Sequence, residues 1–238
     1  MAAVAAVVAL AATATDASGA ATSPTGSTGP TAASGPTAAT GPTAAPVPVV
    51  PHVTLRPGAR GSDVKLLQRE LDTLHYVTGG YGLFDARTQR AVLAFRKVTG
   101  MSRTEVANYA VFKKLATGAG KFKVRYPRQG RHVEGDLTHQ VLALIGPHGH
   151  VERIYPMSSG RPSLPTQPGI FRVWLQELGT NSDGMVDSSF FNGGDAIHGY
   201  AQVPAHRASH GCLRVPIPDA LSIREWVHMG TIVDVYYR

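Results

Sequence analysis

The chain has 238 residues, of which 43% are apolar, which is enough for one or two folded domains and argues against disorder throughout. Its formal net charge of +7 favours acidic partners. However, the basic residues are spread along the chain in no run of five or more, and ordinary solubility explains this charge equally well. The chain has one cysteine, which excludes an intrachain disulfide and a zinc site built from several cysteines.

Two N-terminal segments are predicted to lie outside the folded domains. Residues 1–20 begin with a short apolar run of Ala and Val and continue with small residues, which is typical of a secretory signal segment. This run is too short to cross ~30 Å of hydrocarbon as a stable membrane span. Residues 21–51 are rich in Pro, Gly, Thr and Ala and repeat the motif Gly-Pro-Thr-Ala-Ala, which predicts an extended linker.

Apolar residues at helical spacing predict three helices between residues 53 and 119. Ser62 or Asp63 can cap the first helix and Asp85 the second, which ends at Gly100. The third helix starts after a capping box at Ser102-x-x-Glu105 or later, near Asn108. The inward-facing residues of the three helices are, in order, Val64, Leu67, Leu71 and Leu74; Thr88, Val92 and Phe95; and Val111, Phe112 and Leu115.

From about residue 121 the apolar pattern becomes that of strands. Short apolar runs bounded by Gly and Pro lie at residues 142–145, 150–155, 170–175 and 231–237. Asp219 can cap one helix, for which Gly230 is the stop signal. Many strands with a single helix predict a β-rich sandwich rather than an alternating α/β fold.

Cys212 is the main candidate for a catalytic residue. A free thiol has a pKa of about 8.5, so at neutral pH it needs a nearby base or a positive environment before it can attack a carbonyl. His198, His206 and His210 are close to it in sequence. Gly211 allows the backbone to turn just before the thiol, and successive N–H groups in such a turn can point at one oxygen.

Two other interpretations stay open on this pattern alone. Cys212 can be a small buried apolar residue, with the histidines in ordinary loops. His206 and His210 also have the four-residue spacing of zinc ligands on a helix, although Pro204 and Gly211 argue against a helix at this point.

Three motifs resemble the L,D-transpeptidase catalytic domain, the YkuD family. They are Ile197-His198-Gly199, Ser209-His210-Gly211-Cys212-Leu213-Arg214, and an upstream stretch in which Ile154-Tyr155-Pro156-Met157-Ser158-Ser159-Gly160 precedes Thr166-Gln167-Pro168-Gly169-Ile170-Phe171. The resemblance covers residues 121–238 and implies the β-rich sandwich of that family. Met157, Ser159 and Gln167 depart from the commoner Val, Thr and Pro, and none of them belongs to the expected chemistry.

The resemblance implies a catalytic role for several of these residues. Cys212 is expected to be the nucleophile and His198 the general base, with the carbonyl of Gly199 orienting the imidazole in place of the usual carboxylate. The backbone N–H groups of His210, Gly211 and Cys212 are expected to form the oxyanion hole.

Ser209 and Arg214 are expected to shape the substrate-binding pocket. Arg214 can meet a substrate carboxylate in bidentate fashion. Arg214 can equally well form an ion pair that holds the loop in place.

The helical part resembles the type 1 peptidoglycan-binding domain. The matching residues are Gly58, Gly61, Val64, Leu67, Gln68, Leu71, Leu74, Tyr81, Gly82, Phe84, Asp85, Thr88, Ala91, Val92 and Phe95. Arg96 stands where that family usually has Gln, and the last repeat, Met101 to Leu115, lacks the usual Asp-Gly. Tyr81 and Phe84 can line a glycan groove or belong to the core, and the helices can also be a spacer that no longer binds glycan.

The resemblances together imply a secreted L,D-transpeptidase of the cell wall or a periplasm-like space. A peptidoglycan-binding domain at 53–119 is expected to precede a catalytic domain at 121–238, which would keep its activity without the helices. Tetrapeptide stems would acylate the cysteine with loss of D-Ala, and an amine on a second stem would then form the crosslink. The alternatives are an L,D-carboxypeptidase that uses water and an inactive wall-binding protein.

The expected partners are peptidoglycan stem peptides and glycan. We expect no metal, no organic cofactor, no nucleic acid and no stable membrane span. The sequence does not indicate the oligomeric state.

Overall fold

The computed structural model describes residues 50–238, which belong to one compact unit. The predicted signal segment (1–20) and nearly all of the predicted linker (21–51) lie outside the described residues. Within the described part of the chain, no helix combines the length and apolar character that a membrane span requires.

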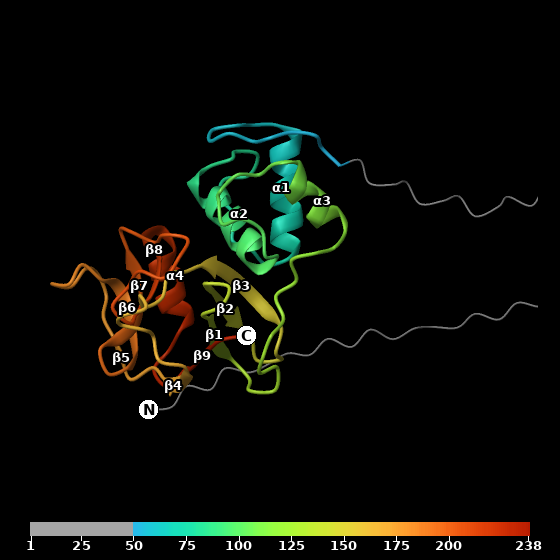
Figure 1. Ribbon diagram of the computed structural model, residues 1–238. Coiled ribbons are helices and arrows are strands. Elements are labelled where there is room, and N and C mark those ends of the chain that lie inside the picture. Colours follow the sequence, from blue (N-terminus) through green and yellow to red (C-terminus); the bar gives the residue numbers. More distant parts are fainter. Residues whose placement is uncertain (1–49) are drawn as a thin grey trace, which may run out of the picture. The chain divides into compact units, whose positions relative to one another are not determined.

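The first part of the described chain forms three helices, α1 (Ser62–Thr73), α2 (Ala86–Val98) and α3 (Tyr109–Ala116), as the periodicity predicts (Figure 1). Their predicted inner faces are buried, except that Leu74, which follows α1, is only partly buried. Phe84 is a core residue, whereas Tyr81 is 63% exposed. Of the two aromatic residues considered for a glycan groove, only Tyr81 is therefore accessible.

The helix starts agree with the predictions in two of three cases. Asp85 caps α2 by accepting a hydrogen bond from the N–H of Thr88 at 2.8 Å. The helix α3 begins after Asn108, which is the later of the two predicted starts. The predicted cap of α1 at Ser62 or Asp63 is wrong, because the chain turns into the helix at Gly61, whose φ of +114° suits only glycine.

The rest of the chain forms two sheets and one helix. The first sheet has the spatial order β3 (Val151–Pro156), β2 (Val141–Ile145), β1 (His132–Asp136), β9 (Ile232–Tyr236) and β4 (Gly169–Arg172). The second has the order β5 (Leu175–Gln176), β6 (Val186–Asn192), β7 (Asp195–Tyr200) and β8 (Leu213–Pro216). Only the β1–β9 and β7–β8 pairs are parallel.

The two sheets and the helix α4 (Ile217–Trp226) share one apolar core, so the predicted β-rich sandwich is confirmed. Alternate residues of each strand point into this core. Leu142 and Leu144 do so from β2, and Leu213 and Val215 from β8. Residues pointing the other way on β7 and β8 face outward, which is where the candidate site lies.

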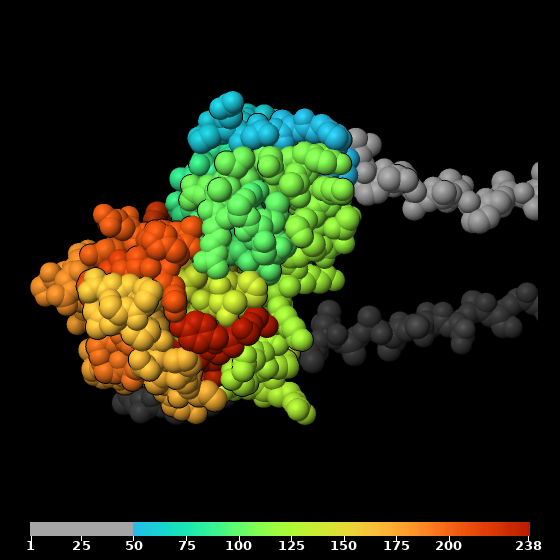
Figure 2. Space-filling model, in the orientation of Figure 1, coloured from blue at the N-terminus to red at the C-terminus, as the bar shows by residue number. Residues whose placement is uncertain are grey.

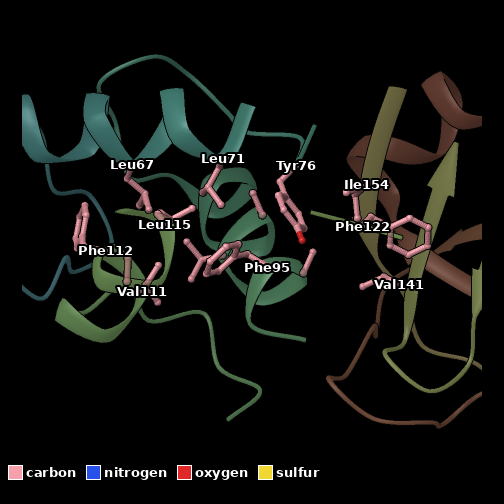
Figure 3. Close-up of a cluster of buried hydrophobic side chains, with 14 of the residues drawn as sticks. Leu67, Leu71, Tyr76, Phe95, Val111, Phe112, Leu115, Phe122, Val141 and Ile154 are labelled. Atoms are coloured by element: carbon pink, nitrogen blue, oxygen red, sulfur yellow. The ribbon is translucent and has the colours of Figure 1, made fainter. Parts of the chain in front are cut away.

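The opposite face of the first sheet is covered by the helices. Val141, Ala143 and Ile145 alternate with the sandwich-facing leucines and join the same apolar cluster as Tyr76 and Phe95 (Figure 3). In the space-filling view the green residues of the helices lie against the yellow-green residues of this sheet (Figure 2). All five residues of β2 are buried because each face has a partner layer.

Polar contacts also join the helices to the sandwich. Lys97 of α2 is buried and its Nζ donates hydrogen bonds to the carbonyls of Gln140 and Met157, at 3.0 and 2.9 Å. Burial lowers the pKa of Lys97 to about 7, with a further contribution from the charge of Arg103. A buried amine that depends on backbone carbonyls for its hydrogen bonds fixes the position of α2 on the end of β3.

Two predicted elements differ from the structure. The predicted strand 170–175 is interrupted, because the N–H of Val173 bonds to Thr231 beside β9 and that of Trp174 bonds to Phe190 in β6. The chain therefore changes sheets between β4 and β5. Asp219 lies inside the first turn of α4 rather than capping it, and its carboxylate pairs with Arg87 of α2 at 2.7 Å.

Candidate active site

The site is built by two neighbouring parallel strands, β7 and β8. Ile197 of β7 pairs with Leu213 of β8, and both point into the sandwich core. The next pair, His198 and Arg214, points to the opposite face. Cys212 precedes Leu213, so the alternation of a strand places its side chain on the same outer face as His198.

The predicted side chains converge on one cavity of about 510 Å³. His198, Ser209, His210, Cys212 and Arg214 all line it. The cavity is completed by Asp183, Met185, Gly194, Asp195 and Tyr200, which the sequence analysis did not single out. Residues 14 positions apart in sequence thus meet in space through the parallel pairing of β7 and β8.

His198 is buried and held in one orientation. Its Nδ1 lies 2.9 Å from the carbonyl oxygen of Gly199. Since a carbonyl can only accept, Nδ1 carries the proton and Nε2 is left as the proton acceptor. Burial lowers the pKa of His198 to about 4; the Gly199 carbonyl opposes this shift and the nearby charge of Arg214 adds to it.

Gly199 has a structural reason to be glycine. A Cβ at this position would lie 2.7 Å from the Cβ of Ala220, because α4 packs directly against this face of β7. The glycine therefore allows α4 to support the strand from behind, while its carbonyl orients the imidazole of His198.

The thiol of Cys212 is half-buried and rests on the backbone of the β6–β7 turn and the start of β7. Its Sγ lies 3.4 Å from the N–H of Ala196 and 3.7 Å from the carbonyl of Gly194. Burial raises the pKa of Cys212; the Ala196 N–H lowers it, Asp195 raises it and Arg214 lowers it. The resting site therefore holds a neutral thiol beside a neutral imidazole, and within residues 50–238 no hydrogen bond joins the two.

The loop before the thiol has an unusual backbone at Gly211. Its φ is +139°, and a Cβ there would lie 2.1 Å from Oδ1 of Asp195. Thr166 Oγ1 donates to the Gly211 carbonyl at 2.5 Å, and Ser209 Oγ donates to the Cys212 carbonyl at 2.6 Å. Two hydroxyls thus hold the successive carbonyls of Gly211 and Cys212.

These contacts bear on the oxyanion hole. The N–H of Gly211 donates to Ser209 Oγ at 3.2 Å and is not free for a substrate oxygen in this arrangement. The N–H groups of His210 and Cys212 have no protein acceptor in the described part of the chain apart from the sulfur of Cys212 itself. Ser209 is fully buried, and its hydroxyl is engaged with the loop rather than directed at a ligand.

Arg214 presents its guanidinium to the cavity. It stacks on the ring of Tyr200 at 4.0 Å and forms no ion pair among residues 50–238. Its Nε is buried without a hydrogen-bond partner in the same range. The ion pair considered for this arginine is therefore absent from the described contacts, and the guanidinium can receive a carboxylate.

The upstream motif of the sequence braces this loop. Ser158 pairs with Arg214 and Gly160 pairs with Ser209 through isolated backbone bridges. The Ser159 carbonyl accepts hydrogen bonds from the N–H groups of Ala208 and Ser209. The motif therefore serves the site by positioning the segment that carries the thiol.

The two histidines considered for zinc do not lie on a helix. Residues 206–212 form bends and a single bridge, so the geometry that their spacing requires is not present. Across residues 50–238, no group of three or more His, Cys, Asp or Glu side chains is arranged to hold a metal ion.

Comparison with known proteins bears on this site. The family model that describes the L,D-transpeptidase catalytic domain, YkuD, matches residues 130–235. The crystal structure of an L,D-transpeptidase from Xylanimonas cellulosilytica is 31% identical, with a TM-score of 0.68. The match covers 81% of this chain and 100% of that chain. The chain belongs to the L,D-transpeptidase family.

The match to the Xylanimonas L,D-transpeptidase extends beyond the catalytic domain. It covers about 193 of the 238 residues, whereas the family model spans 106, so it includes the helices. The family model begins after the helices and does not identify them, so their assignment as a peptidoglycan-binding domain remains a prediction.

Other L,D-transpeptidases of known structure are more distant. One from Stackebrandtia nassauensis is 22% identical, with a TM-score of 0.47, and the match covers 76% of this chain and 94% of that one. The catalytic domain of the E. faecium enzyme is 28% identical with a TM-score of 0.40, over 45% of this chain and 98% of that one. The comparison with curated proteins found no match.

The cavity residues that the sequence analysis missed differ in how they could have been found. Tyr200 follows His198 by two, so assigning a strand at 195–200 would have placed it on the same face. Asp195 lies at the start of that strand, and its carboxylate lies against Gly211. Asp183 and Met185 come from a loop without periodicity, and no signal in this L,D-transpeptidase sequence marks them.

Proposed function

We propose that this protein forms peptidoglycan crosslinks through a thioester on Cys212, using tetrapeptide stems as acyl donors and releasing their terminal D-Ala. One observation carries the proposal. The thiol of Cys212, the imidazole of His198 and the unpaired guanidinium of Arg214 line a single cavity. Covalent acyl transfer requires a nucleophile and a base, and the guanidinium adds a receptor for a substrate carboxylate.

In the acylation step the thiol attacks the carbonyl of the third stem residue. The S–C bond forms as the C–N bond to D-Ala breaks, and the proton of the thiol passes through Nε2 of His198 to the departing amine. Developing negative charge on the carbonyl oxygen is stabilised by the N–H groups of His210 and Cys212, and by that of Gly211 if it leaves Ser209. Arg214 binds a carboxylate of the donor.

In the second step an amine of another stem attacks the thioester and forms the crosslink. Water in place of this amine would give an L,D-carboxypeptidase with the same nucleophile. An inactive wall-binding protein would show neither step. Product analysis separates these three outcomes.

The test is to incubate the purified full-length protein with a disaccharide-tetrapeptide, with and without an acceptor stem, and to identify the products by mass spectrometry. Crosslinked dimer together with free D-Ala supports the proposal. D-Ala and tripeptide alone, with no dimer at any acceptor concentration, would identify a carboxypeptidase. No release of D-Ala would contradict an enzymatic role.

The variant Cys212→Ser tests the nucleophile. We expect loss of D-Ala release with an unchanged folded state, because a hydroxyl lacks the acidity and nucleophilicity of a thiol. A carbapenem, which has a strained carbonyl, should add its mass to the wild type and not to Cys212→Ser. A covalent adduct that persists in the variant would place the nucleophile elsewhere.

We also propose that residues 53–119 bind peptidoglycan and that the protein acts outside the cytoplasm, in the wall or a periplasm-like space. The support is the family's peptidoglycan substrate and the residues that resemble a type 1 peptidoglycan-binding domain. Tyr81 is the accessible aromatic residue of that motif. Retention of full-length protein on insoluble sacculi at physiological salt, reduced in Tyr81→Ala, would support glycan binding.

A further inference from the structure

A second cavity lies where α2 meets the catalytic sandwich. It has a volume of about 330 Å³. Arg90 and Leu93 of α2 form one wall, and the segment after β7 with the start of α4 forms the other, through Ala201 and Ile217. The ion pair between Arg87 and Asp219 joins α2 to α4 beside this cleft.

Tyr200 connects this cleft to the catalytic cavity, because it lines both. Its ring meets that of His198 edge to face at 5.6 Å between centroids and carries the guanidinium of Arg214 at 4.0 Å. Tyr200 is therefore a wall shared by the two cavities, and it contacts the candidate general base directly.

The cleft has the chemistry of a peptide site. The guanidinium of Arg90 makes no hydrogen bond within the described residues, and its Nε is buried. Its ion pair with Asp219 is the longer of the two that this carboxylate makes, at 3.8 Å against 2.7 Å for Arg87. Three prolines and Ile217, which is 41% exposed, provide apolar surface around this cation, and Glu105 adds an acid at the exposed rim.

We propose that this cleft binds the acceptor stem, with Arg90 holding a carboxylate of that peptide while its amine reaches the thioester on Cys212. The inference rests on the acyl transfer proposed above. The acceptor amine must lose a proton as it attacks, so it has to approach His198, and the cleft is separated from His198 only by the shared wall residue Tyr200. The donor, whose carbonyl must sit at Sγ, occupies the other cavity.

The step balances without a co-reactant. The amine nitrogen attacks the thioester carbonyl, a C–N bond forms and the C–S bond breaks. The proton of the amine passes to Nε2 of His198 and from there to the sulfur, which regenerates the thiol. A bound acceptor also lowers the share of acyl-enzyme lost to water, because the amine is already at the carbonyl.

The experiment measures donor and acceptor separately in the full-length protein. The donor is a disaccharide-tetrapeptide with its side-chain amine acetylated, so that it cannot accept. The acceptor is a tripeptide stem with a free amine, which lacks the fourth residue and cannot donate. Crosslinked and hydrolysed products are quantified by mass spectrometry over a range of acceptor concentrations.

We expect Arg90→Met to raise the acceptor KM about tenfold, as the loss of one charge-assisted hydrogen bond does. Ala201→Trp, at an exposed position on the opposite wall, should raise it comparably by filling the cleft. Both should shift products from crosslink to hydrolysis and change the donor KM far less. Arg87→Met is the matched control, because it loses the closer ion pair with Asp219 but does not line the cleft.

Two results would overturn the inference. One is an acceptor KM that matches the wild type in both Arg90→Met and Ala201→Trp while donor is consumed normally. The other is a rise in donor KM with no change for the acceptor, which would assign the cleft to the donor. A wild type that releases no D-Ala would instead overturn the proposed function, and this inference with it.

Discussion

The surroundings of His198 disfavour protonation of its imidazole. Burial and the charge of Arg214 lower its pKa to about 4, and the Gly199 carbonyl only partly opposes them. The imidazole is therefore neutral and able to accept a proton over the whole range from weakly acidic pH upward. The thiol of Cys212 has a raised pKa because it too is buried. In the proposed mechanism, proton transfer therefore accompanies the attack on the carbonyl rather than precedes it.

This gives a prediction for pH dependence. Below its pKa the imidazole is protonated and cannot act as a base, so the kcat/KM for carbapenem acylation should fall to half near pH 4 instead of near 6.5, the ordinary value for histidine. Arg214→Gln should move the half-point upward, because removal of the positive charge raises the pKa of His198. Arg207→Gln, which removes an arginine bound to Tyr237, should leave the half-point unchanged. A wild-type half-point near pH 6.5 would contradict the prediction.

The two histidines beside the thiol should differ in their effect. His198→Ala should slow acylation by about 10²–10⁴, the usual contribution of a general base. His210→Ala should be milder, since His210 is exposed and its expected role uses the backbone N–H, which the variant keeps. Rates of carbapenem adduct formation measured by intact mass compare the two directly. If His210→Ala proves the more damaging, the roles are reversed.

At the residue scale, the sequence motifs lead to several side chains of the candidate site and miss others that line the same cavity. Cys212 and His198 stand in short motifs, so they could be predicted as site residues from the sequence, and both line the cavity. Tyr200 and Asp195 carry no motif and belong to the site only because β7 and β8 pair in parallel. The hydroxyl of Thr166, which holds the carbonyl of Gly211, likewise comes from a segment distant in sequence.

At the scale of the elements, the loop at 209–212 is held by several contacts at once. Gly211→Ala would combine a strained φ with a Cβ placed 2.1 Å from Asp195. We expect carbapenem acylation to slow about 100-fold, as a displacement of ~1 Å in a catalytic group does. Gly130 also has a positive φ, of +76°, but a Cβ added there would meet no atom within 4 Å. Gly130→Ala should therefore show the effect of backbone strain alone and keep the acylation rate of the wild type.

A double variant separates the two causes. Gly211→Ala combined with Asp195→Ala removes the carboxylate that the new Cβ would meet. Its acylation rate, compared with that of Asp195→Ala alone, should recover part of the loss. A rate for Gly211→Ala equal to that of the wild type would show that the loop does not position the thiol.

The strands show what the sequence can and cannot predict at this scale. The run at 142–145 was correctly predicted as a strand. All of its residues are apolar because the helices cover one face of this strand and the second sheet covers the other. The run at 170–175 looks equally continuous but divides between the two sheets. Local pattern indicates extended chain, whereas the partner layers decide where a strand begins and ends.

At the scale of the whole molecule, the helices and the sandwich behave as one body. The helix-facing side of the first sheet belongs to the same apolar cluster as the helices, and Lys97 adds buried hydrogen bonds across the boundary. The sequence predicted two separate domains, because its pattern changes from helical to strand periodicity near residue 121. Periodicity shows which residues of an element are buried, but not which other element covers them. The shared core alters what we expect from truncation.

A protein that starts at Gly120 should therefore be strongly destabilised. It would expose Val141, Ile145 and Ile154, each of which is at most 1% exposed in the intact chain. At about 1.5–3 kcal/mol for each side chain, the loss is on the order of 5 kcal/mol or more, comparable with the total stability of many domains. It would also lose the α2 wall of the proposed acceptor cleft.

Thermal unfolding of this protein, of one starting at Val50 and of the full chain provides the comparison. The protein starting at Val50 keeps every contact described here and should match the full chain. A Gly120 protein with the Tm of the full chain would show that the catalytic domain is autonomous and that the helices are an appended binding module.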